Sequence, residues 1–205
     1  MNFYDRYLLP HLIDCACGMK AIERERAALI PQARGRVLEI GMGTGRNLPY
    51  YDAGKLSALY GLDPAVQMNP KARLRAQRAG LTVELLDLPA ERIPADDASF
   101  DTVVSTFTLC TIPDAAQALR EMRRVLKPGG RLLFCEHGRA PDESVRRWQD
   151  RLTPLWKPLA GGCHLNRDIA GLLAQGGFRT PDLQRRYLPG PRPMTYVYSG
   201  SAVGA

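Results

Sequence analysis

The sequence lacks the residue spacings that mark disulfide-rich and zinc-binding domains. Its five cysteines, Cys15, Cys17, Cys110, Cys135 and Cys163, are odd in number and widely spread. A disulfide framework is therefore not expected, and a reducing cytoplasm fits this pattern better. Because no Cys-x-x-Cys pair or His-x-x-x-His spacing occurs, the sequence predicts no metal site.

Long hydrophobic runs are also missing. The two longest uncharged runs, from Thr102 to Pro113 and from Pro193 to Ala205, have 12 and 13 residues, whereas a membrane-spanning helix needs about 20. Charged residues interrupt the apolar residues near the N-terminus, so no signal peptide is expected. These absences favour a soluble, cytoplasmic protein.

Acidic residues are in the minority. Lys and Arg total 28 against 21 Asp and Glu, which gives a formal charge of +7. A solvated helix surface is the simplest explanation of the basic stretches between Lys71 and Arg78 and between Arg146 and Arg151. No RNA-binding motif accompanies them, so no nucleic-acid partner is expected. Peripheral contact with anionic lipid stays open, and the sequence does not fix the oligomeric state.

What the chain does contain is an alternation of short apolar runs and longer segments of helical period. This order predicts an α/β fold with a doubly wound, mostly parallel sheet covered on both faces. The tail predicts an antiparallel edge hairpin, and 154–163 is interpreted as an irregular connection. Strands are expected at 36–40, 58–62, 82–86, 101–105, 131–135, 183–188 and 194–199, and helices within 1–30 and at 64–79, 114–126, 141–152 and 166–175.

The sharpest motif follows the first of these strands. Gly41, Gly43 and Gly45 alternate after Ile40, and Glu39 lies two residues before the first glycine. Glycine is required where the backbone bends against a ligand, and this spacing differs from the G-x-G-x-x-G of dinucleotide-binding proteins. A carboxylate here suits a cationic ligand, and Asp63 at the end of the second strand is placed to accept hydrogen bonds from ribose hydroxyls. Plain turn glycines and a helix-capping Asp63 are the alternative interpretation.

With these motifs the segment from Arg36 to Phe178 resembles the class I S-adenosylmethionine-dependent methyltransferases. The Glu39 and glycine motif, Asp63, the Ser99-Phe-Asp101 strand and the turn Lys127-Pro-Gly-Gly130 carry the resemblance. It implies a Rossmann-like, seven-stranded, mostly parallel sheet with an antiparallel edge strand. It also implies one domain over 1–205, with an N-terminal helical lid at 1–33, a cofactor-binding core at 36–138 and substrate-side elements at 139–205.

The resemblance also implies which residues bind S-adenosylmethionine. The three glycines lie against its methionine part, Asp63 holds the ribose and Met68 packs on the adenine. Many relatives have an Asp-Ala pair where this chain has Pro89-Ala90, so the residue that meets the adenine amine stays open. The full predicted set is Glu39, Gly41, Gly43, Gly45, Asn47, Asp63, Pro64, Met68, Ala90, Glu91 and Thr106.

Further motifs are similar to one subfamily, the animal alkyl-thiol S-methyltransferases and their bacterial relatives. These are Thr108-Leu-Cys110-Thr, Glu136-His137, Trp148-Gln149 and Gly162-Cys163-x-Leu165-x-Arg167. The membrane anchor of the animal enzymes is not seen here. The resemblance implies a small-molecule acceptor, best interpreted as a thiol. A phospholipid amine or a quinone at a membrane surface is the alternative.

His137 is the candidate catalytic base, because it follows the fifth strand at the edge where ligands bind, and an imidazole titrates near neutral pH. A wall residue bonded to Glu136 is the competing interpretation. Cys110 is expected to line the acceptor pocket, and Trp148 and Trp156 either to add an aromatic wall or to pack in the core. Tyr7 and His11 are expected to cover the pocket from the N-terminal helices. Two alternatives come from other functional classes. One is a non-catalytic subunit that binds S-adenosylmethionine. The other is a nicotinamide-dependent reductase, for which the glycine spacing is wrong.

Overall fold

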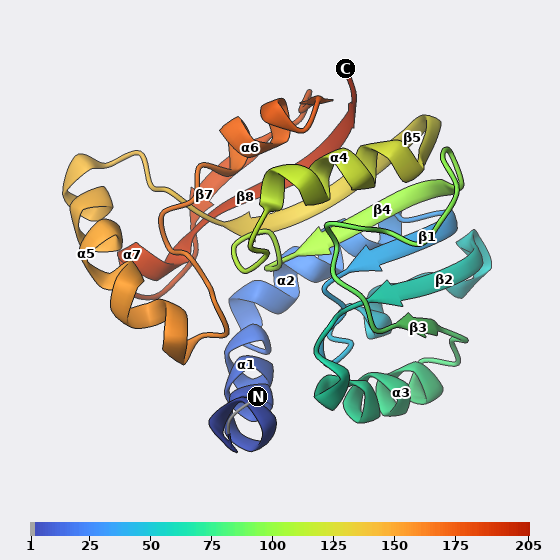
Figure 1. The fold of residues 1–205 in the computed structure, drawn as a ribbon, viewed down its shortest axis with the longest axis horizontal. Helices are drawn as coiled ribbons and strands as arrows, with labels where there is room; N and C mark the ends of the chain where they lie inside the picture. The colour runs from blue at the N-terminus through green and yellow to red at the C-terminus, as the bar shows by residue number, and fades with distance from the viewer. Residues whose placement is uncertain (1–2) are drawn as a thin grey trace.

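The fold is built on one twisted sheet, seen in a computed structural model that describes residues 3–205 (Figure 1). The strand order is β3-β2-β1-β4-β5-β8-β6, and β7 also pairs with β8. Strands β1 to β5 are parallel, and β8 is antiparallel to its neighbours. The strands are β1 (Gly35–Ile40), β2 (Leu56–Leu62), β3 (Glu84–Leu86), β4 (Phe100–Thr106), β5 (Leu126–His137), β6 (Phe178–Arg179), β7 (Gln184–Tyr187) and β8 (Tyr196–Gly204).

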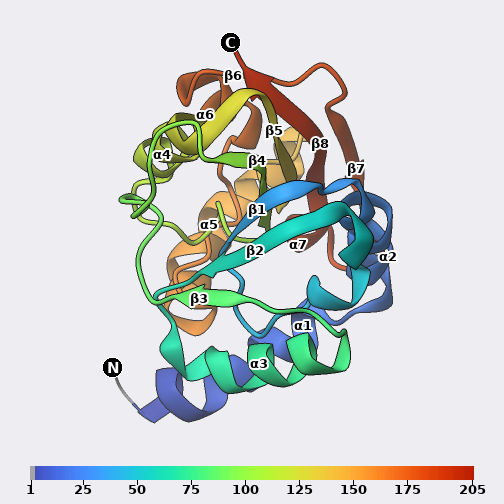
Figure 2. The ribbon, with the colours of Figure 1, turned by 90° about the vertical axis from the view of Figure 1, so that its right-hand side faces the viewer.

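Helices cover both faces of this sheet, as the two-sided apolar character of the strands predicts. Figure 2 shows α4 and α6 on one side and α2 on the other. The α-helices are α1 (Leu9–Cys17), α2 (Lys20–Leu29), α3 (Asn69–Arg78), α4 (Ala115–Val125), α5 (Glu143–Leu159), α6 (Ile169–Gln175) and α7 (Arg192–Thr195). Shorter turns are η1 (Tyr4–Leu8), η2 (Ile30–Gln32), η3 (Leu48–Tyr50), η4 (Ala53–Lys55) and η5 (Val66–Met68).

Two apolar layers follow from the alternation of side chains along the strands. Leu38 and Val103 point to the layer that contains Leu119 and Met122 of α4. Their neighbours Val37 and Val104 belong to the opposite layer. All of them are fully buried, so the two layers hold the sheet rigid beneath the loops at its carboxyl edge.

The fold class predicted from the sequence is confirmed, with two differences in detail. The sheet has eight strands because the pair Phe178–Arg179 also bonds to β8. The antiparallel strand β8 lies one place in from the edge, between β5 and the short strands β6 and β7. The predicted hairpin is present, since β7 pairs with the first half of β8.

The interpretation of 154–163 as a connection was wrong, because α5 continues to Leu159 through Pro154 and Pro158. Proline removes one hydrogen bond to the residue four positions earlier. Asp150 and Pro154 both lie on the exposed side of α5, where water can bond the freed carbonyl group. The longer helix extends along the carboxyl side of the sheet, across from α1 (Figure 1).

Candidate active site

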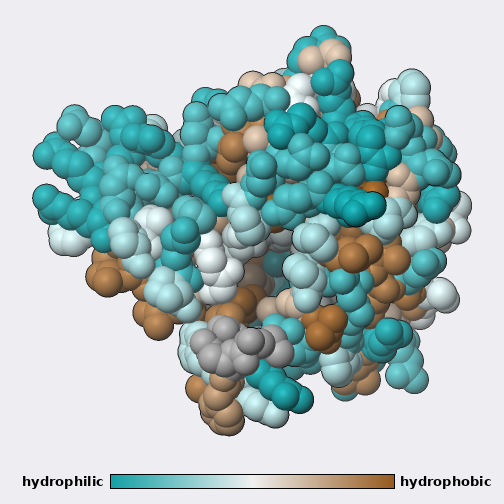
Figure 3. Space-filling view, viewed as in Figure 1, coloured by the Kyte–Doolittle hydropathy of each residue, from teal (hydrophilic) through white to brown (hydrophobic). Residues whose placement is uncertain are grey.

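A cavity of about 1610 Å³ opens at the carboxyl edge of the parallel strands. Figure 3 shows a hollow in this face, next to the N-terminal helix and α5. Its walls come from the ends of β1, β2, β4 and β5, from α1 and α2, and from the end of α5. Of the residues predicted from the sequence, it is lined by Glu39, Gly41, Gly43, Asp63, Pro64, Met68, Ala90, Glu91, Thr106, Cys110 and His137.

The glycine loop is fixed to the end of β2. The Gly43 N–H donates to Asp63 Oδ2 over 2.8 Å, and the Gly41 N–H donates to the Leu62 carbonyl over 2.7 Å. Gly43 has a φ of +53°, and a Cβ there would come no closer than 3.5 Å to any described side chain. It therefore presents bare backbone to the cavity. Gly45 does not line the cavity; a Cβ there would meet Leu48 and the backbone of α3.

Asp63 keeps unused lone pairs although both of its oxygens accept hydrogen bonds. Oδ2 accepts from Gly43 and Oδ1 accepts from the Ala65 N–H, each over 2.8 Å. Burial raises the pKa of Asp63. Met68 Sδ and Asp63 Oδ2 both lie within 4 Å of the position that a Cβ on Gly43 would take. A carboxylate and a buried apolar side chain thus lie side by side in the lining, as a ribose and an adenine ring require.

Glu39 lies at the bottom of the cavity and is 2% exposed. Oε2 accepts from the Tyr51 hydroxyl over 2.8 Å, and Oε1 accepts from Asn47 Nδ2 over 3.0 Å. Burial raises the pKa of Glu39 to about 7. Asn47 is itself buried and does not line the cavity, so it acts on the site by holding Glu39.

A buried arginine that the sequence analysis missed completes this end. Arg26 of α2 lines the cavity and is 3% exposed, and its Nη1 donates to Thr106 Oγ1 over 2.7 Å. Its Nε has no hydrogen-bond partner among the residues that the structure describes. A buried cation with an unused donor, beside the carboxylate of Glu39, can hold the two opposite charges of an amino-acid group. The site therefore fits the methionine part of S-adenosylmethionine.

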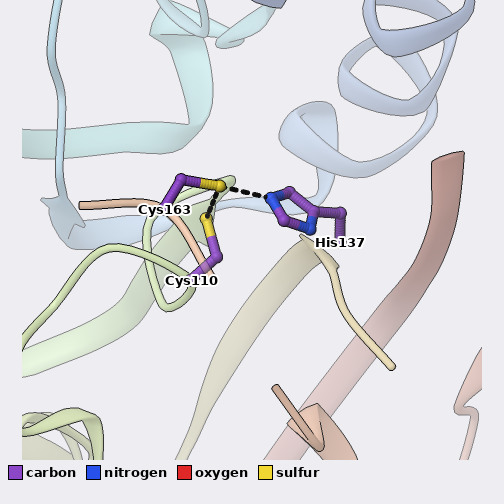
Figure 4. Close-up of side chains that lie close together, drawn as sticks. All are labelled: Cys110, His137 and Cys163. Carbon is purple, nitrogen blue, oxygen red and sulfur yellow. Dashed lines mark hydrogen bonds between the residues drawn. The ribbon is translucent and has the colours of Figure 1, made fainter. Parts of the chain in front are cut away.

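Another part of the lining contains two sulfur atoms and an imidazole. His137 Nε2 lies 2.8 Å from Cys163 Sγ, which lies 3.7 Å from Cys110 Sγ (Figure 4). The hydrogen bond with Cys110, opposed by burial and supported by His137, lowers the pKa of Cys163. The same contact with Cys163 raises the pKa of Cys110. Sequence reasoning placed Cys110 and His137 here but did not identify Cys163 as their neighbour.

Two loops bring these residues together, and three groups fix the loops. The His164 N–H donates to the Cys110 carbonyl over 2.9 Å. Arg167 Nη1 donates to the carbonyls of Leu109 and Ile112. The buried Glu136 accepts from the Thr108 N–H over 2.8 Å, and burial raises its pKa to about 6. The position of Cys110 is therefore set by backbone contacts rather than by a free loop.

Three predicted acceptor-side residues do not line the cavity. Tyr7 is 51% exposed and Trp148 is 55% exposed. His11 is exposed, with Nδ1 3.2 Å from Lys71 Nζ. Of the two tryptophans considered for the acceptor wall, only Trp156, from the last turns of α5, lines the cavity. The structure thus covers the cavity with other N-terminal residues, Leu9, Ile13, Ala16, Cys17, Met19 and Ile22.

Asp14 ties this N-terminal cover to the core. It accepts from Thr44 Oγ1 over 2.5 Å, from Arg46 Nε over 2.9 Å and from Arg75 Nη1 over 2.8 Å. Burial alone raises its pKa, but the hydrogen bonds from Arg75, Thr44 and Arg46 outweigh burial and hold it well below its usual range. Helix α1 is therefore anchored to both the glycine loop and α3.

Across residues 3–205, none of the helices has the length and hydropathy needed to span a bilayer.

Comparisons with known proteins agree with this geometry. A family model described as a methyltransferase domain matches residues 38–134. The chain is 34% identical over 164 residues to thiol S-methyltransferase TMT1B of Rattus norvegicus, covering 73% of this chain and 64% of that protein. It is 35% identical over 116 residues to phosphatidylethanolamine N-methyltransferase of Cereibacter sphaeroides, covering 56% of each. The chain thus spans less than two thirds of the length of both relatives.

The solved structures show the same fold. A SAM-dependent methyltransferase from Aquifex aeolicus superposes with a TM-score of 0.64 at 20% sequence identity, over 94% of this chain and 97% of that one. The sheet, the glycine loop with its two carboxylates and the matched family model lead to one assignment. The chain belongs to the class I S-adenosylmethionine-dependent methyltransferases.

Proposed function

We propose that the protein transfers the methyl group of S-adenosylmethionine to the sulfur of a small thiol. The observation that carries the proposal is the composition of the cavity beyond the cofactor end, where Cys110, His137, Cys163 and Trp156 are part of the lining. Sulfur atoms and aromatic rings make a soft, weakly hydrated wall, which suits an apolar thiol better than a charged or sugar-like acceptor. The similarity to thiol S-methyltransferase TMT1B supports the same acceptor class.

Opposite charges would hold the cofactor at the other end. Arg26 is available to the carboxylate of its amino-acid group, and Glu39 to the ammonium. Asp63 would bind the ribose hydroxyls, with Met68 against the adenine. When bound, S-adenosylmethionine supplies a methyl group already activated on a sulfonium, so the residues of the site have only to align the acceptor and exclude water.

Two groups at the acceptor end serve a sulfur nucleophile. His137 remains our candidate for the acceptor of the thiol proton, and its Nε2 contact makes Cys163 part of the same proton-holding pair. The Trp156 indole N–H is buried and lies beside Cys163, where it joins Cys110 and His137 in lowering the pKa of that thiol. It is available to donate a hydrogen bond to a thiolate at this end of the cavity.

The test is methyl transfer from isotope-labelled S-adenosylmethionine to a panel of alkyl and aryl thiols, with matched alcohols and amines as controls. Mass spectrometry of the products is expected to show labelled methyl thioethers from thiols alone. Formation of S-adenosylhomocysteine with amines and not with thiols would overturn the proposal.

A specific surface feature favours a second candidate, a phospholipid amine presented at a membrane. The Tyr4 hydroxyl bonds to the Leu159 carbonyl over 2.6 Å, which joins η1 to the end of α5 beside the cavity. Around this junction several large apolar side chains are 50% or more exposed, namely Phe3, Tyr7, Leu8, Leu12, Leu155 and Leu159. Figure 3 shows apolar residues at the lower edge of the molecule on both sides of the hollow. With Arg147 and Arg151 also exposed on α5, this surface suits an anionic lipid interface.

A further inference from the structure

The cluster of Cys110, His137 and Cys163 has the composition and spacing of a metal site. One ligand atom from each residue lies within 4.8 Å of the other two. The residues come from the loop after β4, the end of β5 and the loop after α5 (Figure 4). The spacing of these residues in the sequence does not predict such a site, because the three ligands belong to three separate segments.

The distance between the two sulfur atoms fits a tetrahedral zinc-class ion. Two thiolates bound to zinc at about 2.3 Å in tetrahedral geometry have their sulfur atoms about 3.8 Å apart. The Cys110 and Cys163 sulfur atoms lie 3.7 Å apart. The 2.8 Å contact of His137 Nε2 with Cys163 Sγ is a hydrogen bond, and a shared metal would lengthen it to about 3.6 Å. Metal binding would therefore move His137 Nε2 and Cys163 Sγ about 0.8 Å apart.

The surroundings of the cluster hold the ligands in place. Arg167 and the His164 N–H bind the loop of Cys110, and Glu136 binds its first residue, Thr108. Contacts of this kind fix the direction of metal ligands and set the affinity of the site. The cluster is therefore a built arrangement rather than a chance meeting of mobile side chains.

We propose that Cys110 Sγ, Cys163 Sγ and His137 Nε2 bind one zinc-class ion, and that its fourth position opens into the cavity. Zinc sites with three protein ligands and an open position are catalytic rather than structural. All three residues line the cavity, so the open position faces the space where the acceptor lies. This part of the inference rests on the proposed function, since the fourth ligand is the sulfur of the acceptor thiol.

The charges and protons balance in this arrangement. Two cysteine thiols release their protons to solvent on binding, so two thiolates and one neutral imidazole neutralise the divalent ion. An acceptor thiol that joins the ion releases a third proton and binds as a thiolate. In the metal-loaded protein His137 is thus a ligand, and the ion lowers the pKa of the acceptor thiol. In the metal-free protein the imidazole of His137 accepts the thiol proton.

The experiment is a cobalt titration of the reduced, chelator-treated protein. Cobalt(II) in a tetrahedral thiolate site gives intense visible bands and a sulfur-to-metal charge-transfer band. We expect saturation at one equivalent and displacement of the bands by zinc. Addition of 1-butanethiol is expected to shift the visible bands, because it changes the fourth ligand.

Matched variants make the test specific. C110S, C163S and H137Q are each expected to weaken metal binding by about a hundredfold or more, since even the loss of a group that only supports a ligand costs 10–100-fold. C15S, at an exposed cysteine outside the cavity lining, is expected to bind as the unmodified protein does. Circular dichroism identifies any variant that fails to fold. If one of the three ligand variants does not fold, metal binding by the other two tests the proposal.

Several outcomes would overturn the inference. One is cobalt binding that survives C110S and C163S, and another is a Cys110–Cys163 disulfide in place of a retained metal, seen as two fewer free thiols. Equal thioether formation by chelated and zinc-loaded protein would remove the catalytic role while leaving the proposed function intact. A proper cobalt spectrum without any thioether product would instead refute the proposed function and leave the metal site standing.

Discussion

Arg26 of α2 donates a hydrogen bond from Nη1 to the hydroxyl of Thr106 at the end of β4, over 2.7 Å. The contact brings a guanidinium from the N-terminal helices to the bottom of the cavity, where its Nε is left without a partner among the described residues. The N-terminal segment therefore contributes a charged group to the cofactor end as well as a cover over the cavity.

We expect R26Q to weaken binding of S-adenosylhomocysteine by about tenfold or more, because a hydrogen bond to a charged group contributes about 1.5–3 kcal/mol. Calorimetric titration measures the change. R24Q, at an exposed position of the same helix, is the matched control. Equal affinities for R26Q and R24Q would remove Arg26 from the site.

D63N is expected to weaken binding of adenosine-containing ligands by about ten- to a hundredfold, since it loses charged hydrogen bonds to the ribose. The amide oxygen of D63N can keep only one of the two contacts that Asp63 makes with the Gly43 and Ala65 N–H groups, so circular dichroism has to show that the variant is folded. The control is D52N, at an exposed turn. Unchanged affinity for S-adenosylhomocysteine in D63N would contradict the proposed role of Asp63.

Glu39 gives the ligand-free protein a distinctive pH dependence. Burial raises its pKa from 4.5 to about 7, so between these values the folded state binds a proton that the unfolded chain has lost. The free energy of unfolding therefore falls as the pH rises through this window, by at most about 1.4 kcal/mol per pH unit for one proton. Urea unfolding of E39Q is expected to show a flatter pH profile than the unmodified protein, and E143Q, at an exposed residue, an unaltered one.

D14N tests the anchor of the N-terminal cover. The pKa of Asp14 is held low, so its contribution to stability is present above pH 4 and is lost only in acid. At neutral pH we expect a loss of about 1–2 kcal/mol, which is moderated by solvent screening of the partly exposed arginines. Limited proteolysis is expected to cut D14N faster within the N-terminal helices. Protection equal to that of the unmodified protein would show that the anchor is dispensable.

The lipid candidate is tested by L155D. Leu155 is 70% exposed, and its burial in an interface contributes about 1.5–3 kcal/mol. We expect co-sedimentation with phosphatidylglycerol vesicles to fall by about tenfold or more. L74D, at an exposed leucine of α3, controls for added charge. Absence of vesicle binding by the unmodified protein at low salt would eliminate this candidate.

Local pattern and motif predicted the sheet, the glycine loop and its two acids, because each depends on a few neighbouring residues. The role of Arg26 was not predicted, because the sequence of a charged amphipathic helix does not show whether a basic residue faces solvent or a cavity. The contact of Cys163 with Cys110 was not predicted, because the two residues lie far apart in the chain. Cys163 also follows helix α5, whose prolines were interpreted as a break. Tyr7, His11 and Trp148 were placed on the right segments, but helix rotation, which sequence alone does not fix, turned them away from the cavity.

Strand β8 has a consequence for how the chain is assembled. It lies between β5 and β6 although it follows both in the sequence, and it pairs Leu132 with Ala202. On a ribosome, β6 therefore emerges before the strand that links it to the rest of the sheet exists. The edge of β5 stays unpaired until β8, far downstream in the sequence, has been made. Pairing between strands so far apart in the chain is the kind of long-range contact that slows folding.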